Sequence, residues 1–165
     1  LLLVEHQGVS VVEGGLLLSL FALIGLPISL IMPLLSTRYP MSQSSIVWFS
    51  FVSGVTGTLG LLFGDVSLTW LWVIAFGFGT TMFQLALTLF NLRSRERSTV
   101  LAVSAFGQGV SYTTASIAVF LVGVLREVTG GWDAALWLLF ASCLIAIPVA
   151  LQIRKGQMID DELAR

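Results

Sequence analysis

The chain has 165 residues, of which 56% are hydrophobic and 10% are charged, and its formal net charge is −1. A soluble domain is about 25% charged, and one of this size has too little interior to bury so much apolar surface. The composition therefore excludes an ordinary water-soluble domain and indicates a chain that is solvated by lipid. The single cysteine, Cys143, excludes a disulfide within the chain.

Five long stretches without charged residues follow one another along the chain. A helix of about 20 apolar residues crosses a bilayer core, so we predict an all-α integral membrane protein with five transmembrane helices. The chain begins with LLLVEH, and we interpret residues 1–13 as the end of a preceding helix and an extracytoplasmic loop. The predicted bundle covers residues 14–153, with spans at about 14–36, 45–64, 67–91, 99–125 and 133–153, and residues 154–165 form a predicted cytoplasmic tail.

Capping and turn residues mark several of the predicted helix ends. Ser10 and Glu13 have the spacing of a capping box directly before the first span. Ser67 and Asp133 are candidate N-caps of the third and fifth spans. The glycine pair that begins at Gly130 predicts a tight turn before the last helix.

The basic residues fall almost entirely in alternate gaps between the predicted spans. Seven of the eight lie in the second, fourth and sixth gaps, and only Arg126 lies in the others. Because basic residues near span ends favour the cytoplasm, we predict that these three gaps face the cytoplasm and that the C-terminus is cytoplasmic. The residues that determine this topology are Arg38, Arg93, Arg95, Arg97, Arg154 and Lys155.

Polar residues recur on one face of the third span and on one face of the fourth. In lipid, such residues turn towards other helices or towards a water-filled path. We interpret the two faces as walls of a polar cavity, while helix packing alone is the alternative interpretation for the small and hydroxyl residues. The substrate-path candidates are Thr81, Gln84 and Thr88 in the third span and Gln108, Ser111 and Tyr112 in the fourth.

The two glutamines are the most demanding of these residues. A primary amide in hydrocarbon costs several kcal/mol if it has no partner. Gln84 and Gln108 must therefore bond to another helix, to water or to a solute. By contrast, the second span carries glycines at regular spacing, from Gly54 to Gly64, and we interpret these as packing residues.

Aspartate, glutamate, lysine, arginine and histidine are absent from the interiors of the predicted spans, and so are catalytic motifs. A proton relay needs an ionisable residue at depth, and no metalloprotease motif or phosphate-binding glycine loop occurs. We therefore expect no enzymatic activity, no metal and no cofactor. The expected partners are a small-molecule solute, the lipid bilayer and missing N-terminal helices of the same protein, with no nucleic acid.

Several stretches of the sequence carry a family resemblance. They are VEHQGVSVVEGGLLLSLFALIGLPISLIMPLL (residues 4–35), ALTLFNLRSRE (86–96), and LAVSAFGQGVSY followed by VGVLREVTGGWDAALWLL (101–112 and 122–139). In order and spacing they resemble the C-terminal half of major facilitator superfamily transporters, closest to the cyanate permease branch. Ser111, where that branch tends to have glycine, is a departure that leaves the solute open.

The resemblance implies a fold and a mechanism. The five spans would be helices eight to twelve of a twelve-helix carrier in a bacterial inner membrane. It would move a small anion or small organic solute by alternating access, with the eighth, tenth and eleventh helices around the cavity. Two other interpretations remain, namely a five-helix repeat of a drug/metabolite-type transporter and a non-transporting membrane scaffold subunit.

Overall fold

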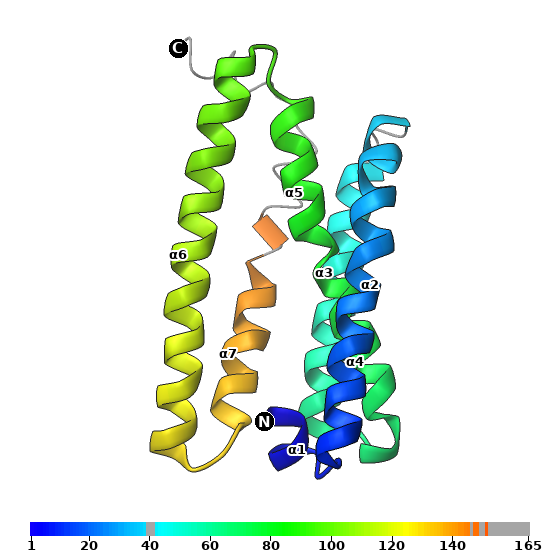
Figure 1. Cartoon of the computed structure of the whole chain (residues 1–165), viewed down its shortest axis with the longest axis vertical. Helices are drawn as coiled ribbons and strands as arrows, with labels where there is room; N and C mark the ends of the chain where they lie inside the picture. The colour runs from blue at the N-terminus through cyan, green and yellow to red at the C-terminus, as the bar shows by residue number, and fades with distance from the viewer. Residues whose placement is uncertain (39–41, 146, 149–150, 152–165) are drawn as a thin grey trace.

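The computed structural model describes residues 1–38, 42–145, 147–148 and 151, and all regular elements in this part of the chain are helical (Figure 1). The helices run roughly alongside one another between two ends of an elongated bundle. In chain order they are α1 (Leu2–His6), α2 (Val11–Arg38), α3 (Ser42–Phe63), the 3-10 turn η1 (Val66–Leu68), α4 (Thr69–Gly79), α5 (Thr81–Leu92), α6 (Arg97–Thr129) and α7 (Asp133–Leu144).

Four helical stretches of the described residues are long and apolar enough to cross a membrane. They are Val11–Arg38, Gln43–Phe63, Val66–Leu92 and Arg97–Thr129, and they correspond to the first four predicted spans. The predicted fifth span begins at Asp133, where α7 begins, but α7 has only 12 residues. Most of residues 145–153 lie outside the described part of the chain, so a count of five spans is not established.

The capping predictions have mixed outcomes. The capping box is confirmed, because Ser10 N–H donates to Glu13 Oε2 at 2.9 Å and Glu13 N–H donates to Ser10 Oγ at 3.2 Å. The prediction for Ser67 is wrong, because the cap is Asp65, whose carboxylate accepts the Ser67 N–H at 2.8 Å. Asp133 is the first residue of α7 and not its N-cap.

The turn predicted at Gly130 is confirmed. Gly130 has φ of 72°, a left-handed conformation that glycine adopts without strain, and its N–H closes α6 on the Arg126 carbonyl.

The predicted third span is interrupted in its middle at Thr80. α4 ends at Gly79 and α5 begins at Thr81, so the span consists of two helices in series. Ser50 of α3 lies across this break. Its hydroxyl donates to the Gly79 carbonyl and accepts the Met82 N–H at 3.2 Å. One side chain therefore satisfies backbone groups on both sides of the interruption.

α3 and α4 approach each other closely through glycine. A Cβ added to Gly57 would lie 2.7 Å from the Phe76 Cα, and one added to Gly60 would overlap the Trp72 ring. The glycines predicted to serve packing therefore do so. Further along the bundle, α2 lies against α4 and α5, and α7 lies against α3. The buried apolar residues form two clusters, Ile28, Met32, Val47, Leu85 and Leu89 in one and Leu61, Val73 and Leu136 in the other.

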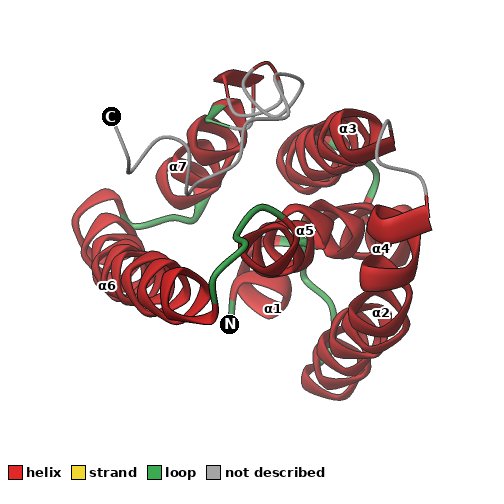
Figure 2. Ribbon diagram, turned by 90° about the horizontal axis from the view of Figure 1, so that it is seen from above, coloured by secondary structure: helices red, strands yellow, loops and turns green. Residues whose placement is uncertain are grey.

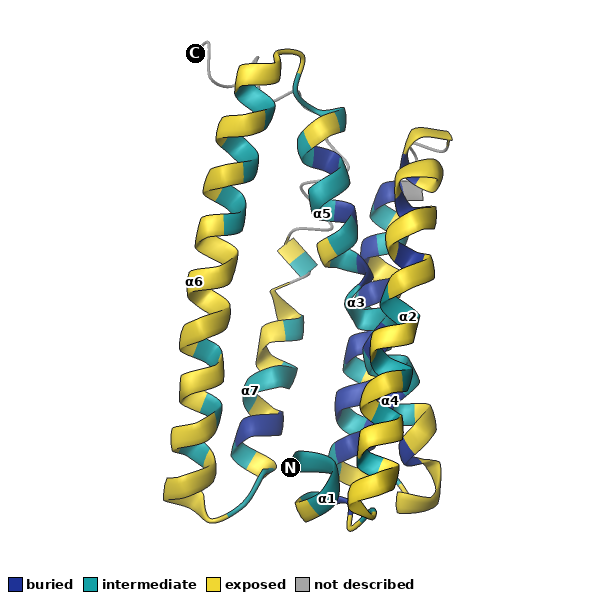
Figure 3. Ribbon diagram, in the orientation of Figure 1, coloured by how far each residue is buried: buried dark blue, intermediate teal, exposed yellow. Residues whose placement is uncertain are grey.

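α6 stands at the side of the bundle (Figure 2). It contacts α5 and α7 and has no buried residue, and most of its surface is exposed (Figure 3). α2 likewise exposes long apolar side chains, among them Leu30 and Leu34. These surfaces are suited to lipid or to other transmembrane helices.

Candidate functional site

The polar residues predicted on the third span do not share one buried face. The buried positions of α4 and α5 recur every four residues, at Thr69, Val73, Gly77, Thr81, Leu85 and Leu89. Of the three candidates predicted on this span, only Thr81 lies in this row. Gln84 and Thr88 lie beside the row and are half-buried.

Thr81 borders an apolar pocket of about 440 Å³ between α2, α3 and the broken span. Its hydroxyl donates to the Phe78 carbonyl at 2.5 Å, within the same span. The other lining residues include Pro27, Ile28 and Phe49. The hydroxyl is thus already bonded, and the pocket offers a solute few polar groups.

Thr88 is also satisfied by its own helix, since its hydroxyl donates to the Gln84 carbonyl at 3.0 Å. For the Gln84 side chain, no hydrogen bond is found among the described residues. Its amide remains available to water, a solute or another helix.

On α6, Gln108 is half-buried, whereas Ser111 and Tyr112 are exposed. The Ser111 hydroxyl donates to the Gly107 carbonyl at 2.7 Å, and Tyr112 has 62% of its surface accessible. Because its side chain is exposed, Tyr112 does not pack between helices of the described bundle.

α5 and α6 meet close to Gln108. A Cβ on Gly107 would lie 2.6 Å from Phe90 Cζ, so the two helices are in contact one residue away from the glutamine. The structure therefore brings together the two helices that carry Gln84 and Gln108. It shows no hydrogen bond between these two side chains within the described residues.

A second pocket, of about 280 Å³, lies at the break in the third span. Ser50, Thr80, Ser142 and Cys143 are among its lining residues. Neither Ser50 nor Thr80 is among the site residues predicted from the sequence. The cluster Gly77-Phe-Gly-Thr-Thr81, rich in poor helix formers, was the signal for a break at this point.

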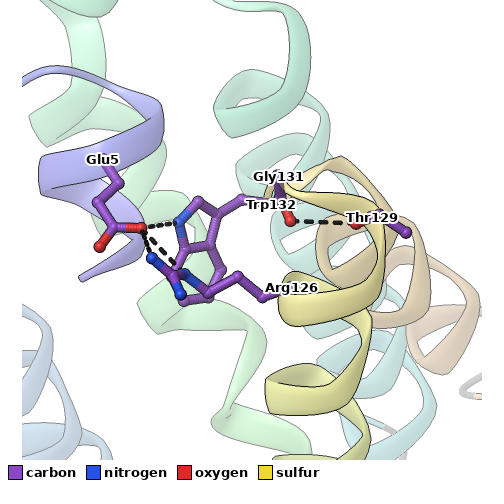
Figure 4. A network of polar contacts seen from close by, with 5 residues as sticks. All are labelled: Glu5, Arg126, Thr129, Gly131 and Trp132. Carbon is purple, nitrogen blue, oxygen red and sulfur yellow. Dashed lines mark hydrogen bonds and ion pairs between the residues drawn. The ribbon is translucent and has the colours of Figure 1, made fainter.

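A polar network at the end of the bundle that holds α1 was also missed (Figure 4). Glu5 Oε2 accepts hydrogen bonds from Arg126 Nε at 3.0 Å and from Trp132 Nε1 at 2.9 Å. These bonds hold the pKa of the Glu5 carboxyl below its usual value, and the bond from Arg126 has the largest effect. We call this end of the molecule the Glu5 end.

The opposite end carries arginines near the ends of three helices. Arg38 is the last residue of α2, and Arg93 and Arg97 flank the turn between α5 and α6. Arg93 Nη2 donates to Gln43 Oε1 at 3.2 Å, which ties this turn to the start of α3. We call this the arginine end. The predicted topology residues Arg154 and Lys155 lie outside the described residues.

Comparison with known proteins supplies one relative. The chain is 28% identical over 145 residues to the uncharacterized transporter YycB of Bacillus subtilis (strain 168). The match covers 87% of this chain and 36% of the relative, so the chain spans about a third of that protein's length. No family model matches the chain, and no solved structure matches it.

The match and the helices agree at a coarse level. The relative is named a transporter, and transporters are built from membrane-spanning helices. The apolar helices suggest a multi-pass membrane protein.

Proposed function

We propose that the chain is part of a secondary active transporter that moves a small anion or small organic solute by alternating access. The observation that carries this proposal is the similarity to YycB, which extends over most of the chain. The four long apolar helices support it, since they provide a membrane-embedded scaffold. A span broken within the membrane is also a feature from which transporters build their sites.

More specifically, we propose that the chain is the C-terminal half of a major facilitator superfamily carrier of the cyanate permease type. Under it, α2 to α7 would correspond to helices eight to twelve. Further helices would cover the exposed faces of α2 and α6 and complete the cavity. The similarity to a longer protein supports this picture, because the match spans only 36% of that relative.

Gln84 and Gln108 are the residues we propose for contact with the solute. The hydroxyls of Thr81, Thr88 and Ser111 donate to carbonyls of their own spans and are thereby satisfied. The amides can each donate two hydrogen bonds and accept two, which suits a polar solute. Both lie on helices that contact each other. Tyr112, which is exposed, would take part only from the side of α6 that faces additional helices.

For orientation, we propose that the arginine end faces the cytoplasm of a bacterial cell. The support is the positive-inside rule, applied to Arg38, Arg93, Arg95 and Arg97. The Glu5 end would then face outwards.

Thiol accessibility tests whether an aqueous path exists beside these helices. In a Cys143→Ser background, single cysteines are placed at Gln84, Gln108 and, as the matched control, Val119, which is exposed on α6. A water-soluble maleimide is expected to label the first two positions in lipid vesicles and to leave position 119 unlabelled. If none of the three reacts, the polar faces only pack, as in a scaffold subunit.

A further inference from the structure

The network at the Glu5 end joins segments that are far apart in sequence. One carboxylate oxygen, Glu5 Oε2, accepts from Arg126 Nε at 3.0 Å, from Arg126 Nη2 at 2.5 Å and from Trp132 Nε1 at 2.9 Å. The Arg126 guanidinium also lies 5.4 Å from the centroid of the Trp132 ring. Carboxylate, guanidinium and indole therefore contact one another in a closed triangle (Figure 4).

The same short segment is tied to the other side of the bundle by Gln7. This side chain is 6% exposed, and its Nε2 donates to the Leu61 carbonyl of α3 at 2.6 Å. Its Oε1 accepts the hydroxyl of Thr69, the first residue of α4, at 3.2 Å. Residues 5–7 thus bond to α3 and α4 through Gln7 and to the α6–α7 turn through Glu5.

At this end of the bundle, α6 packs mainly against α7. α6 has no buried residue, and its contact with α5 at Gly107 lies far along the helix from Arg126. α7 packs on α3 through Leu136, which is fully buried. The bond from Arg126 to Glu5 therefore adds a tie between this end of α6 and α1, beside the contacts of α6 with α7 and α5.

We propose that Glu5, Arg126 and Trp132 form a constitutive clasp, which holds the α6–α7 turn against α1 so that the Glu5 end of the bundle moves as one body. The clasp transmits the position of α3 and α4, through Gln7, to the end of α6. It is independent of which solute is carried and of whether the chain transports.

The charges around the clasp keep it closed at neutral pH. The hydrogen bonds from Arg126 and Trp132 hold the pKa of Glu5 below its usual value. The other titratable groups at this seam are His6 and Asp133, whose Nδ1 and Oδ1 are 3.7 Å apart, and Glu127 beside Arg126. A carboxylate with a lowered pKa stays ionised at neutral pH, so protonation of Glu5 weakens the clasp only in acid.

Hydrogen–deuterium exchange of the whole protein in lipid nanodiscs tests this proposal. Glu5→Gln keeps the shape of the side chain and removes its charge. We expect amide exchange to rise in residues 2–8 and in residues 126–134 together, by roughly three- to tenfold for a partly exposed charged contact. Glu127→Gln, which removes the neighbouring carboxylate, is the matched control and should leave both segments unchanged.

A double-variant cycle separates the clasp from a general structural effect. The charges of Glu5 and Arg126 act on each other. Amide exchange in residues 126–134 should therefore be no faster in the double variant Glu5→Gln/Arg126→Gln than in Arg126→Gln alone. Additive effects, or a rise confined to residues 2–8, would overturn the proposal. If a variant fails to fold, amide exchange of the unsubstituted protein is measured at falling pH and corrected for the intrinsic exchange rate. Residues 2–8 and 126–134 should then open over the same pH range, and opening at different pH values would also overturn the proposal. None of these readouts depends on transport.

Discussion

The hydroxyl of Ser50 in α3 bonds to the Gly79 carbonyl at the end of α4 and to the Met82 N–H in the first turn of α5. A helix interrupted within a membrane leaves backbone groups that lipid cannot satisfy. Ser50, which is 3% exposed, supplies both a donor and an acceptor at the interruption. The break at Thr80 is therefore stabilised from a neighbouring helix.

Removing this hydroxyl should destabilise the bundle. Ser50→Ala leaves the Gly79 carbonyl and the Met82 N–H without that partner in a buried position. We expect the free energy of unfolding to fall by about 1–3 kcal/mol, the usual cost of an unsatisfied buried polar group. Denaturant titration in detergent measures it, with Ser53→Ala on the same helix as the control. If the free energy of unfolding falls equally in the two variants, the Ser50 hydroxyl has no special role at the break.

The contact between α3 and α4 should tolerate no side chain at Gly57. A Cβ there would lie 2.7 Å from the Phe76 Cα, which is backbone and cannot move aside cheaply. Gly57→Ala should therefore lower the free energy of unfolding by about 1–3 kcal/mol, as overpacking does.

Gly123 on α6 provides the control for this substitution. A Cβ added there meets no atom within 4 Å. Gly123→Ala should be neutral or stabilising by up to about 1 kcal/mol, because alanine favours a helix over glycine. A Gly57→Ala variant as stable as this control would contradict the close packing.

Orientation in the membrane can be measured with single cysteines at the two ends. In a Cys143→Ser background, Glu96→Cys lies in the turn at the arginine end and Glu127→Cys lies at the Glu5 end. In intact cells, an impermeant maleimide should label position 127 and leave position 96 unlabelled until the cells are opened. The reverse pattern would contradict the proposed topology.

The Asp65 cap should respond to acid. The hydrogen bond from the Ser67 N–H lowers the pKa of the Asp65 carboxyl, so the ionised cap stabilises the folded state. That stability is present above the ordinary aspartate pKa and is lost as the pH falls through the lowered value. Exchange of the Ser67 amide, corrected for its intrinsic rate, should rise over this acidic range. Asp65→Asn, which still caps but does not ionise, should remove the pH dependence.

The ends of the helices were largely predictable from the sequence. The first four charge-free stretches coincide with the four long apolar helices of the described residues. The Ser10–Glu13 box and the turn at Gly130 obey local rules that depend only on neighbouring residues. The N-cap was predicted at Ser67 and lies two residues earlier, at Asp65, because aspartate and serine are both favoured N-cap residues.

The features that were not predicted depend on residues distant in sequence. The poor helix formers around Thr80 indicate a weak point in the helix, but the partner that stabilises a break there, Ser50, lies on another helix. Glu5 and Arg126 are 121 residues apart, and no periodicity relates them. The exposure of Tyr112 likewise follows from where α5 and α7 meet α6, which helical spacing alone does not determine.

Uptake by the reconstituted whole protein is the most direct test of the proposed transport function. Proteoliposomes are assayed for counterflow of labelled small anions (nitrate, cyanate, formate and acetate) and of urea, first without substitution. We predict saturable uptake of at least one probe, reduced about tenfold or more by Gln108→Ala, the effect of roughly 1.4 kcal/mol or more on transport. Thr113→Ala, five residues further along α6 with its hydroxyl bonded to the Gly109 carbonyl, should transport normally. Saturable uptake that is unchanged in Gln108→Ala at equal incorporation would contradict the assignment of the path, and no saturable uptake of any small solute would contradict the transport function itself.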